Sequence, residues 1–234
     1  MTEENDSLLG PVIDARPAPK PQRVTLKGRY VTVGPLAREH AASLYALAGG
    51  VAQASLFAYL FNGPFADEAA FAADVEAKTK PEDPLYFAVL DNRTGQAVGY
   101  QSLMRIDTTH RVIEVGGILY TPALQGTPGS TEAQFLLARY VFATLGYRRY
   151  EWKCNDRNAP SRRAAARLGF TYEGVFRQHM IVKAHSRDTA WFSMLDHEWP
   201  ACRAAFEAWL APENFDASGR QIQRLEDLRA PSSP

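Results

Sequence analysis

Residues 85–120 constrain the fold most, because three strand-like segments follow one another there with only short polar turns between them. The segments are LYFAVLD at 85–91, AVGYQSLMRID at 97–107 and VIEVGGILY at 112–120. Short turns of this kind join neighbouring antiparallel strands. We therefore expect an antiparallel meander at the centre of the fold, with the other elements packed around it.

The segments on either side of the meander mix strand and helix periods. Strands are predicted at 30–36, 148–154, 171–183 and 188–196, and helices at 36–50, 67–80, from about 130 to 142, at 159–170 and at 198–210. The linker 184–187 is expected to join the last two strands. This order predicts an α+β (α/β) fold in which helices flank one central, mixed and mostly antiparallel sheet of about seven strands.

Composition excludes several classes of protein. The chain has 26 Lys and Arg against 26 Asp and Glu, so its formal net charge is zero and it lacks the basic surface that nucleic acids or acidic membranes require. No apolar run is long enough to span a membrane, and the first ten residues contain no apolar signal core. Cys154 and Cys202 lie in apolar segments, as free thiols of a cytoplasmic protein do. We expect a cytoplasmic protein with no metal, nucleic-acid or membrane partner.

A glycine-rich passage follows the meander. Gly116-Gly117 interrupts a strand, which indicates a bulge or a close approach by a ligand. The loop 125–130, QGTPGS, then leads into an apolar helix expected to start at Ser130 or Thr131, with Thr131 and Gln134 as a capping box. Free N–H groups and the helix dipole at such a start attract anions, although an ordinary capped turn has the same residues. The loop is neither a Walker nor a dinucleotide-binding motif.

A second motif, NAPSRRAAARLGF at 158–170, makes the interpretation specific. The spacing of Asn158, Ser161, Ala165 and Gly169-Phe170 is similar to the second signature of the GNAT acetyltransferase superfamily. The strand, loop and helix at 112–142 resemble the first signature of that superfamily, Q/R-x-x-G-x-G/A. The stretches LGFTYEGVFRQ and RDTAWFSMLDHEW look like the branch of ribosomal-protein N-terminal acetyltransferases (RimJ/RimL type). The resemblance covers residues 24–210.

The resemblance implies a site for acetyl-CoA. The pyrophosphate would lie on the N–H groups of 126–131, and the pantetheine arm between the strand of Gly116-Gly117 and the strand of 151–154. The implied cofactor-binding residues are Gln125, Gly126, Thr127, Gly129, Ser130, Thr131, Asn158 and Ser161.

The chain also departs from the superfamily pattern. Pro128 stands where glycine is usual and removes one N–H donor, and Ser130 replaces Gly or Ala. Ala165 occupies the position at which many members carry the tyrosine that protonates the leaving thiolate. The resemblance implies that Ser161 takes over as the acid, while its position is equally that of a helix cap.

The base is less clearly marked. Glu114 on the glycine-containing strand is the candidate catalytic base, and a pairing with Arg111 or Arg105 is an equal alternative. The glutamate of RimL-like enzymes, nineteen residues after the serine, is replaced by Met180. The adjacent His179 titrates near neutrality but is expected to face the opposite side of its strand.

The acceptor side is marked mainly by aromatic residues. Tyr59, Phe61 and Trp191 are candidate substrate-binding residues, Phe65 is a further candidate wall residue, and packing in the core is the alternative for all of them. Arg177, Arg187 and Asp188 could recognise a charged acceptor, although a solvated hairpin end is expected for Arg187-Asp188.

We therefore interpret the chain as an acetyl-CoA-dependent N-acetyltransferase that acts on a protein N-terminal or small primary amine by direct attack in a ternary complex. Two alternatives remain: a catalytically inactive acyl-CoA-binding module and a plain α+β binding protein. The expected organisation is an extended arm (1–23), a GNAT-like domain (24–211) and a tail (212–234). The arm and the terminal helix are candidate dimer elements.

Overall fold

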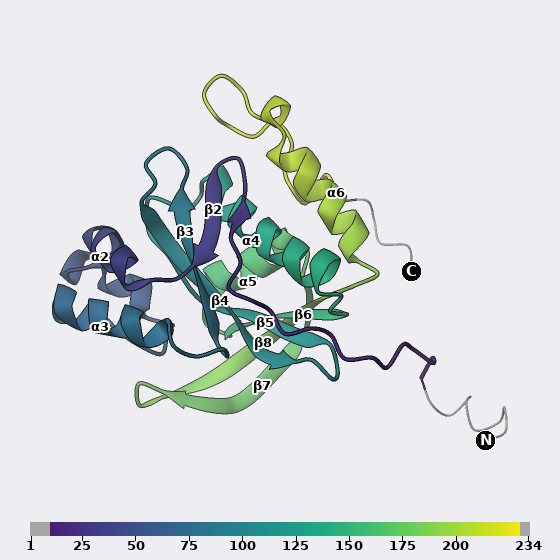
Figure 1. The fold of residues 1–234 in the computed structure, drawn as a ribbon, viewed down its shortest axis with the longest axis horizontal. Coiled ribbons are helices and arrows are strands. Elements are labelled where there is room, and N and C mark those ends of the chain that lie inside the picture. The colour runs from purple at the N-terminus through teal and green to yellow at the C-terminus, as the bar shows by residue number, and fades with distance from the viewer. Residues whose placement is uncertain (1–9, 230–234) are drawn as a thin grey trace.

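The computed structural model describes residues 10–229, and the ends of the predicted arm and tail at 1–9 and 230–234 lie outside the described residues. One open sheet of eight strands has the order β1-β2-β3-β4-β5-β6-β8-β7, with helices on both of its faces (Figure 1). All neighbouring strands are antiparallel except β5 and β6, which are parallel. The predicted α+β class and the mixed, mostly antiparallel sheet are confirmed.

The strands follow the predicted alternation closely. They are β1 (Leu26–Lys27), β2 (Val31–Pro35), β3 (Leu85–Asp91), β4 (Ala97–Asp107), β5 (Val112–Tyr120), β6 (Arg149–Asn155), β7 (Thr171–Val182) and β8 (His185–Leu195). The sequence predicts seven of these, and the eighth is the two-residue β1. The turn between β7 and β8 is Lys183-Ala184, both with positive φ (51° and 62°), so the predicted linker at 184–187 is wrong and residues 185–187 belong to β8.

The helices occupy the predicted segments. They are α2 (Ala41–Ala48), α3 (Glu68–Lys78), α4 (Pro128–Arg139), α5 (Ala159–Leu168) and α6 (Trp199–Leu210), with short helical turns η1 (Arg38–His40), η2 (Val51–Phe57), η3 (Tyr140–Thr144) and η4 (Pro212–Asn214). None of the helices in the described part of the chain is long and apolar enough to cross a membrane.

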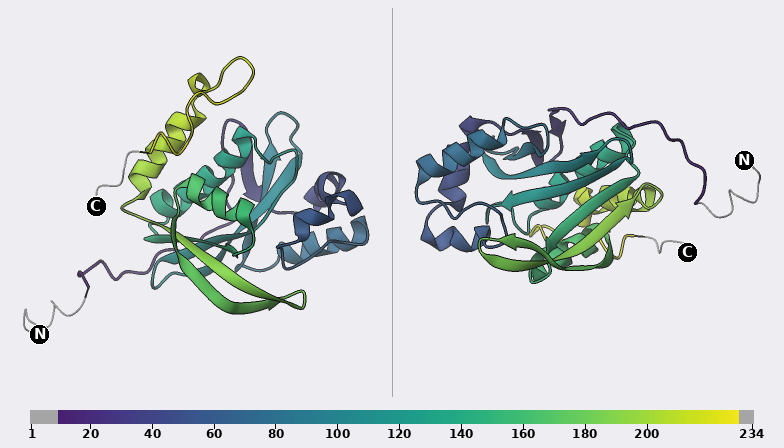
Figure 2. Two further views of the ribbon diagram at one scale, coloured as in Figure 1. Left: turned by 180° about the vertical axis from the view of Figure 1, so that it is seen from behind. Right: turned by 90° about the horizontal axis from the view of Figure 1, so that it is seen from below.

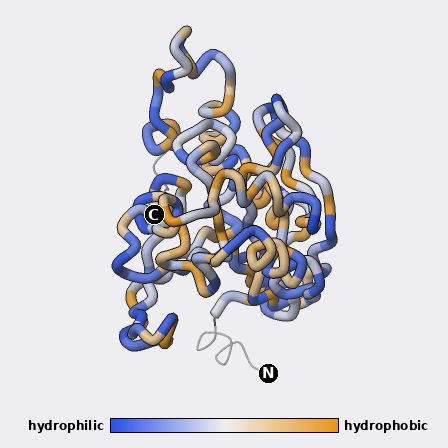
Figure 3. Tube along the Cα trace, turned by 90° about the vertical axis from the view of Figure 1, so that its left-hand side faces the viewer, coloured by the Kyte–Doolittle hydropathy of each residue, from blue (hydrophilic) through white to orange (hydrophobic). Residues whose placement is uncertain are grey.

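Alternating strand residues supply two separate cores, one on each face of the sheet. Phe87 and Val89 of β3 pack with α4, α5 and α6, whereas Ala88 between them packs with α2 and α3. Apolar segments are accordingly distributed through the whole molecule rather than collected in one block (Figure 3). Cys154 and Cys202 are both buried and free, as predicted.

Helix α4 begins at Pro128, two residues earlier than expected. Proline is favoured at the first helical position because it has no N–H that would need an acceptor. The predicted capping box is absent: Thr131 Oγ1 accepts from Arg167 Nη1 at 2.9 Å, and Gln134 Nε2 donates to Gln101 Oε1 and the Tyr120 hydroxyl, both at 2.8 Å. Gln134 therefore ties α4 to the sheet instead of closing its own first turn.

Glu132 fastens α4 to the beginning of β2. Its buried carboxylate accepts hydrogen bonds from the backbone N–H groups of Arg29, Tyr30 and Val31 at 2.7, 2.6 and 2.8 Å. Gly28 makes room for it, since a Cβ at residue 28 would lie 2.4 Å from the carboxyl carbon. The preceding segment 10–25 has no helix or strand, and its later part lies against the domain, where Ala18 is buried and its N donates to Thr108 O at 2.9 Å.

The β7–β8 hairpin extends past the rest of the sheet until its tip lies beside the α2–α3 side of the molecule (Figures 1 and 2). At the tip, Lys183 Nζ donates to the carbonyl oxygen of Phe57 in η2 at 2.7 Å. This contact joins the tip of the hairpin to η2, and both elements border an opening between strands β5 and β6 of the sheet.

Candidate active site

The opening lies where β5 and β6, the one parallel pair among the described strands, separate. Strands β5 and β6 pair from Val112 with Arg149 to Val115 with Trp152, and beyond that point neither is paired to the other. A cleft of about 620 Å³ occupies the gap, with β4, β5, α4, β6, α5, the β7–β8 hairpin and the segment after η2 as its walls. Of the predicted site residues, the cleft wall includes Tyr59, Phe61, Glu114, Gln125, Gly126, Ser130, Thr131, Asn158 and Ser161.

The two strand glycines form the predicted bulge. In the β4–β5 ladder Ser102 pairs with Gly116 and Tyr100 with Leu119, so β5 has one residue more than β4 between these pairs. Gly117 has φ of +58°, and a Cβ there would lie 2.8 Å from the Tyr86 hydroxyl. A bulge bends its strand, which is consistent with β5 leaving β6 at this point.

The N-terminus of α4 lies on the cleft with part of its backbone unoccupied. Thr127 N and Ser130 N already donate to the carbonyls of Leu124 (3.3 Å) and Thr127 (3.2 Å), which contradicts the predicted use of these two N–H groups for an anion. In residues 10–229 we find no acceptor for the N–H groups of Gly126 and Gly129. Thr131 is the fourth residue of α4, at a position where the N–H ordinarily donates within the helix. Thr127 and Gly129 do not line the cleft, and Gly129 packs against the Val31 side chain.

Arg167 of α5 adds a full positive charge beside this helix end. Its Nη1 donates to Thr131 Oγ1, and the side chain lines the cleft. The helix dipole and the guanidinium both favour an anion at this place. Arg167 could not be identified from the sequence, because the position of an arginine within a helix does not indicate which neighbouring helix its side chain reaches.

Asn158 and Ser161 have different tasks at the start of α5. Asn158 is the helix cap, because its Oδ1 accepts from Ser161 N at 3.2 Å, so the alternative of Ser161 as the cap is wrong. Ser161 Oγ accepts from Trp152 Nε1 at 3.0 Å. Since an indole N–H can only donate, the hydroxyl proton of Ser161 remains available to another acceptor. Burial raises the pKa of the nearby Cys154 thiol, and a hydrogen bond with Ser161 partly offsets this effect.

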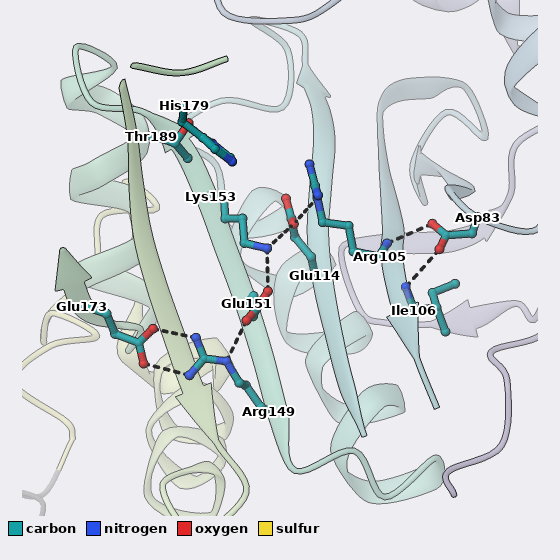
Figure 4. Close-up of polar contacts among 10 residues, drawn as sticks. All are labelled: Asp83, Arg105, Ile106, Glu114, Arg149, Glu151, Lys153, Glu173, His179 and Thr189. Atoms are coloured by element: carbon teal, nitrogen blue, oxygen red, sulfur yellow. Dashed lines mark hydrogen bonds and ion pairs between the residues drawn. The ribbon is translucent and has the colours of Figure 1, made fainter. Parts of the chain in front are cut away.

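Glu114 belongs to a row of ion pairs across β4, β5 and β6 that is buried except at Arg105 (Figure 4). Its Oε2 lies 3.0 Å from both Arg105 Nε and Lys153 Nζ, and Lys153 Nζ also lies 2.6 Å from Glu151 Oε2. The predicted pairing with Arg105 is confirmed, whereas the alternative with Arg111 is wrong. Burial raises the pKa of Glu114, and Lys153 and Arg105 act in the opposite direction. Lys153 was not identified from the sequence.

His179 also reaches the cleft. The β7–β8 register shifts between Phe176 and Met180, where Gln178 has φ of +48°, and both His179 and Met180 line the cleft. The expectation that these two neighbours face opposite sides is therefore wrong, because a bulge breaks the alternation. His179 Nδ1 lies 3.0 Å from Thr189 Oγ1 (Figure 4). Partial desolvation lowers the pKa of His179, and Arg105, Arg187 and Lys153 lower it further.

The predicted aromatic wall is only partly present. Tyr59 and Phe61 line the cleft, and the Tyr59 hydroxyl donates to Arg157 O at 3.1 Å. Trp191 lies behind the wall, where its ring packs on Phe176 at a tilt of 37° (centroids 4.5 Å apart) and Lys153 Nζ lies 3.8 Å from its centre.

Three further candidate acceptor residues have different positions. Two of them do not line the cleft, and the third lines it although it was expected to be solvated. Phe65 packs on Phe57 and Phe71 in the core. Arg187, expected in a solvated hairpin end, is only 8 % exposed and lines the cleft with its guanidinium 5.4 Å from the Phe61 ring centre. Arg177 is exposed and lies outside the cleft wall.

Comparison with known proteins is consistent with this geometry. Residues 31–171 match the family model described as acetyltransferase (GNAT) domain. The chain is similar to the crystal structure of a GCN5-related N-acetyltransferase from Brucella melitensis, with 50% identity, a TM-score of 0.89, and coverage of 92% of this chain and 97% of that one. It is also similar to a probable GNAT-family acetyltransferase from Chromobacterium violaceum, with 39% identity, a TM-score of 0.76, and coverage of 82% and 96%. No curated protein matches the chain. On the extent of these matches, the chain belongs to the GNAT family of acetyltransferases.

Proposed function

We propose that the protein transfers an acetyl group from acetyl-CoA to a primary amine by direct attack in a ternary complex, in the manner of the RimJ/RimL-like branch. The observation that carries the proposal is the cleft between the separated strands β5 and β6, which has an anion-attracting helix end on one side and titratable side chains on the other. Free backbone on both strand edges suits an extended ligand with amide groups of its own.

The anionic part of acetyl-CoA fits the α4 side of the cleft. The N–H group of Gly126, which has no acceptor in the described chain, and the guanidinium of Arg167 supply donors and positive charge there. Ser130, Gln125 and Asn158 complete this wall. The loss of the N–H at Pro128 is compensated in this arrangement, because the Gly126 N–H and the Arg167 guanidinium remain as donors at the cleft.

In the reaction the amine nitrogen attacks the thioester carbonyl, a C–N bond forms, and the C–S bond breaks. Ser161 passes its hydroxyl proton to the leaving sulfur and regains a proton from water, so that no serine alkoxide remains. The proton lost by the amine passes to Glu114, directly or through water. Both ion pairs of Glu114 use Oε2, while Oε1 lies beside Gly116 and, in the described chain, accepts no hydrogen bond. Burial raises the pKa of Glu114, which makes it a stronger base than an exposed carboxylate.

The first experiment is calorimetric titration with acetyl-CoA, followed by a thiol-release assay with a panel of amines. We expect the parent to bind and Ser130→Glu to bind much more weakly, because a carboxylate then occupies the anion site without harm to the first helical turn. Ser130→Ala is the matched control and keeps most of the affinity.

Ser161→Ala separates an enzyme from a binding module. We expect its acetyl-CoA affinity to stay near that of the parent and its kcat to fall by about 10²-fold, the lower end of the range for a lost general acid, because a thiolate is already a tolerable leaving group. A parent that does not bind acetyl-CoA would overturn the proposal. Binding without transfer to any amine would favour the inactive module, and an unchanged kcat in Ser161→Ala would remove Ser161 from the mechanism.

A further inference from the structure

The charges that line the cleft are strongly unequal. Among the described residues of its wall, one carboxylate faces four permanent cations, namely Glu114 against Arg105, Lys153, Arg167 and Arg187. The whole chain is neutral, so this excess is a local property of the cleft. Arg167 lies on the α4 side proposed for acetyl-CoA, which leaves three cations and one carboxylate around the acceptor.

Two of these three cations already have a partner. Lys153, with a side chain only 6 % exposed, is held between Glu114 and Glu151, and Arg105 pairs with Glu114. Arg187 differs from both, because no carboxylate of the described chain lies within ion-pair distance of it. The neighbouring Asp188 is engaged elsewhere, since its carboxylate accepts from Gln178 N at 2.6 Å.

Arg187 is nevertheless buried. It is 8 % exposed, its Nε is buried without a hydrogen-bond partner, and the Phe61 ring lies 5.4 Å from the guanidinium carbon. A buried guanidinium with neither a counter-ion nor a full set of acceptors is costly to a fold. Burial lowers the pKa of Arg187, the charges of Cys154 and Glu114 oppose this effect, and Arg105 adds to it. Such a residue at the wall of a cleft indicates an anionic ligand group.

The opening around Arg187 suits a small ligand. Lys183 Nζ bridges the hairpin to Phe57 O at 2.7 Å, and the Tyr59 hydroxyl bridges the η2 side to Arg157 O at 3.1 Å. These two bridges tie η2 and the segment after it to the hairpin and to the β6–α5 loop, so we infer that they limit access to the cleft on the side opposite to α4. The 620 Å³ must also admit the acetyl end of acetyl-CoA, which leaves little space for an extended peptide.

We propose that the acceptor is a small amine that also carries a carboxylate, and that Arg187, with Arg105 beside it, binds this carboxylate while the amine lies toward Glu114. The inference rests on the proposed function and names the substrate class of the same site. A guanidinium matches a carboxylate through two parallel N–H···O bonds. A polyamine would instead bring additional positive charge to three cations that are already close together.

The test compares acceptors of the same size in the thiol-release assay. The probes are amino acids with the amine at the α or the ω position, their matched carboxamides, and 1,4-diaminobutane. We expect kcat/KM of the parent to be at least about 10-fold higher for the best amino acid than for its carboxamide, as expected for one charge-assisted hydrogen-bond pair. Equal or better rates with carboxamides or with the diamine would overturn the inference.

The matched variants are Arg187→Met and Arg177→Met. Replacing Arg187 should lower kcat/KM for the carboxylate acceptor by about 10- to 100-fold, mainly through KM, and leave the carboxamide and the affinity for acetyl-CoA nearly unchanged. Replacing the exposed Arg177, outside the cleft wall, should alter neither acceptor. An Arg187→Met variant that slows both acceptors equally would contradict the assignment.

The failures of the two proposals are distinguishable. Loss of acetyl-CoA binding in the parent would remove the proposed function together with this inference. Binding of acetyl-CoA with transfer to amines that lack a carboxylate would remove only the inference. If Arg187→Met does not fold, the parent's ratio between amino acid and carboxamide decides alone.

Discussion

Glu132 offers the sharpest test of how α4 is held against the sheet. Its carboxylate accepts three backbone N–H groups, of which that of Val31 is buried while those of Arg29 and Tyr30 are nearer to solvent. Glu132→Gln keeps the shape of the side chain, but only one oxygen remains to accept. The bond from Arg29 is lost, and the bonds from Tyr30 and Val31 lose their charge assistance.

The magnitude follows from these three bonds. A hydrogen bond to a charged group contributes about 1.5–3 kcal/mol and a neutral one about 0.5–1.5 kcal/mol. One lost bond at a solvent-accessible donor and two weakened bonds therefore reduce the free energy of unfolding by roughly 2–4 kcal/mol. For a chain of this size about 2–4 °C of Tm corresponds to each kcal/mol, so we expect Tm to fall by roughly 5–15 °C.

The assay is thermal unfolding at neutral pH followed by circular dichroism, with the urea midpoint as a second measure. Glu207→Gln is the matched control, because Glu207 is an exposed residue of α6 that pairs with Arg203 at 2.8 Å. Exposed pairs of this kind contribute less than about 1 kcal/mol. A Glu132→Gln variant whose Tm is as close to the parent's as that of Glu207→Gln would refute the reasoning.

Two other predictions concern the bulge in β5 and the ion pair between Arg149 of β6 and Glu173 of β7. Gly117→Ala should lose about 1–2 kcal/mol for its positive φ plus the cost of displacing the Tyr86 hydroxyl, whereas Gly95→Ala, with φ of +71° and open space around it, should lose only the first amount; equal urea midpoints for the two variants would contradict this. Hydrogen bonds from Arg149 hold the pKa of Glu173 below 4.5, so its carboxylate stabilises the fold above pH 4.5 and this contribution is lost as the pH falls through the folded-state pKa. Tm of Glu173→Gln should therefore decline less steeply than that of the parent below pH 4.5, and parallel Tm–pH curves would show that the pair has no such role.

The helices and strands that were predicted correctly are those in which the residue pattern itself determines where the element begins and ends. The meander of β3, β4 and β5 has the predicted bounds because alternating side chains serve two cores, and α5 ends as expected at Gly169, whose φ is +103°. Strand β1 has two residues, too few to show a period. The turn at Lys183-Ala184 was missed because neither residue signals a positive φ, and this error in turn made Arg187 look solvated.

The parts of the site that could be predicted are those formed by residues close together in the sequence. The glycine bulge and the Asn158–Ser161 turn each depend on neighbours in the sequence, and both are present. Lys153, Arg167 and Arg187 come from β6, α5 and β8, and their positions depend on the register of the sheet and the packing of α5. No spacing within a single segment reports that Lys153 lies opposite Glu114, or that Arg187 faces Phe61 across the cleft.

The separation of β5 from β6 gives the sheet two edges inside the molecule as well as the two at β1 and β7. An exposed strand edge ordinarily invites pairing with the strand of another protein. Here α4, α5 and the hairpin surround the inner edges, so a foreign strand with bulky side chains on both faces has no access to them. The protein can therefore keep backbone donors and acceptors permanently open for a slender ligand without the risk of aggregation that the same groups would carry at the outside of the sheet.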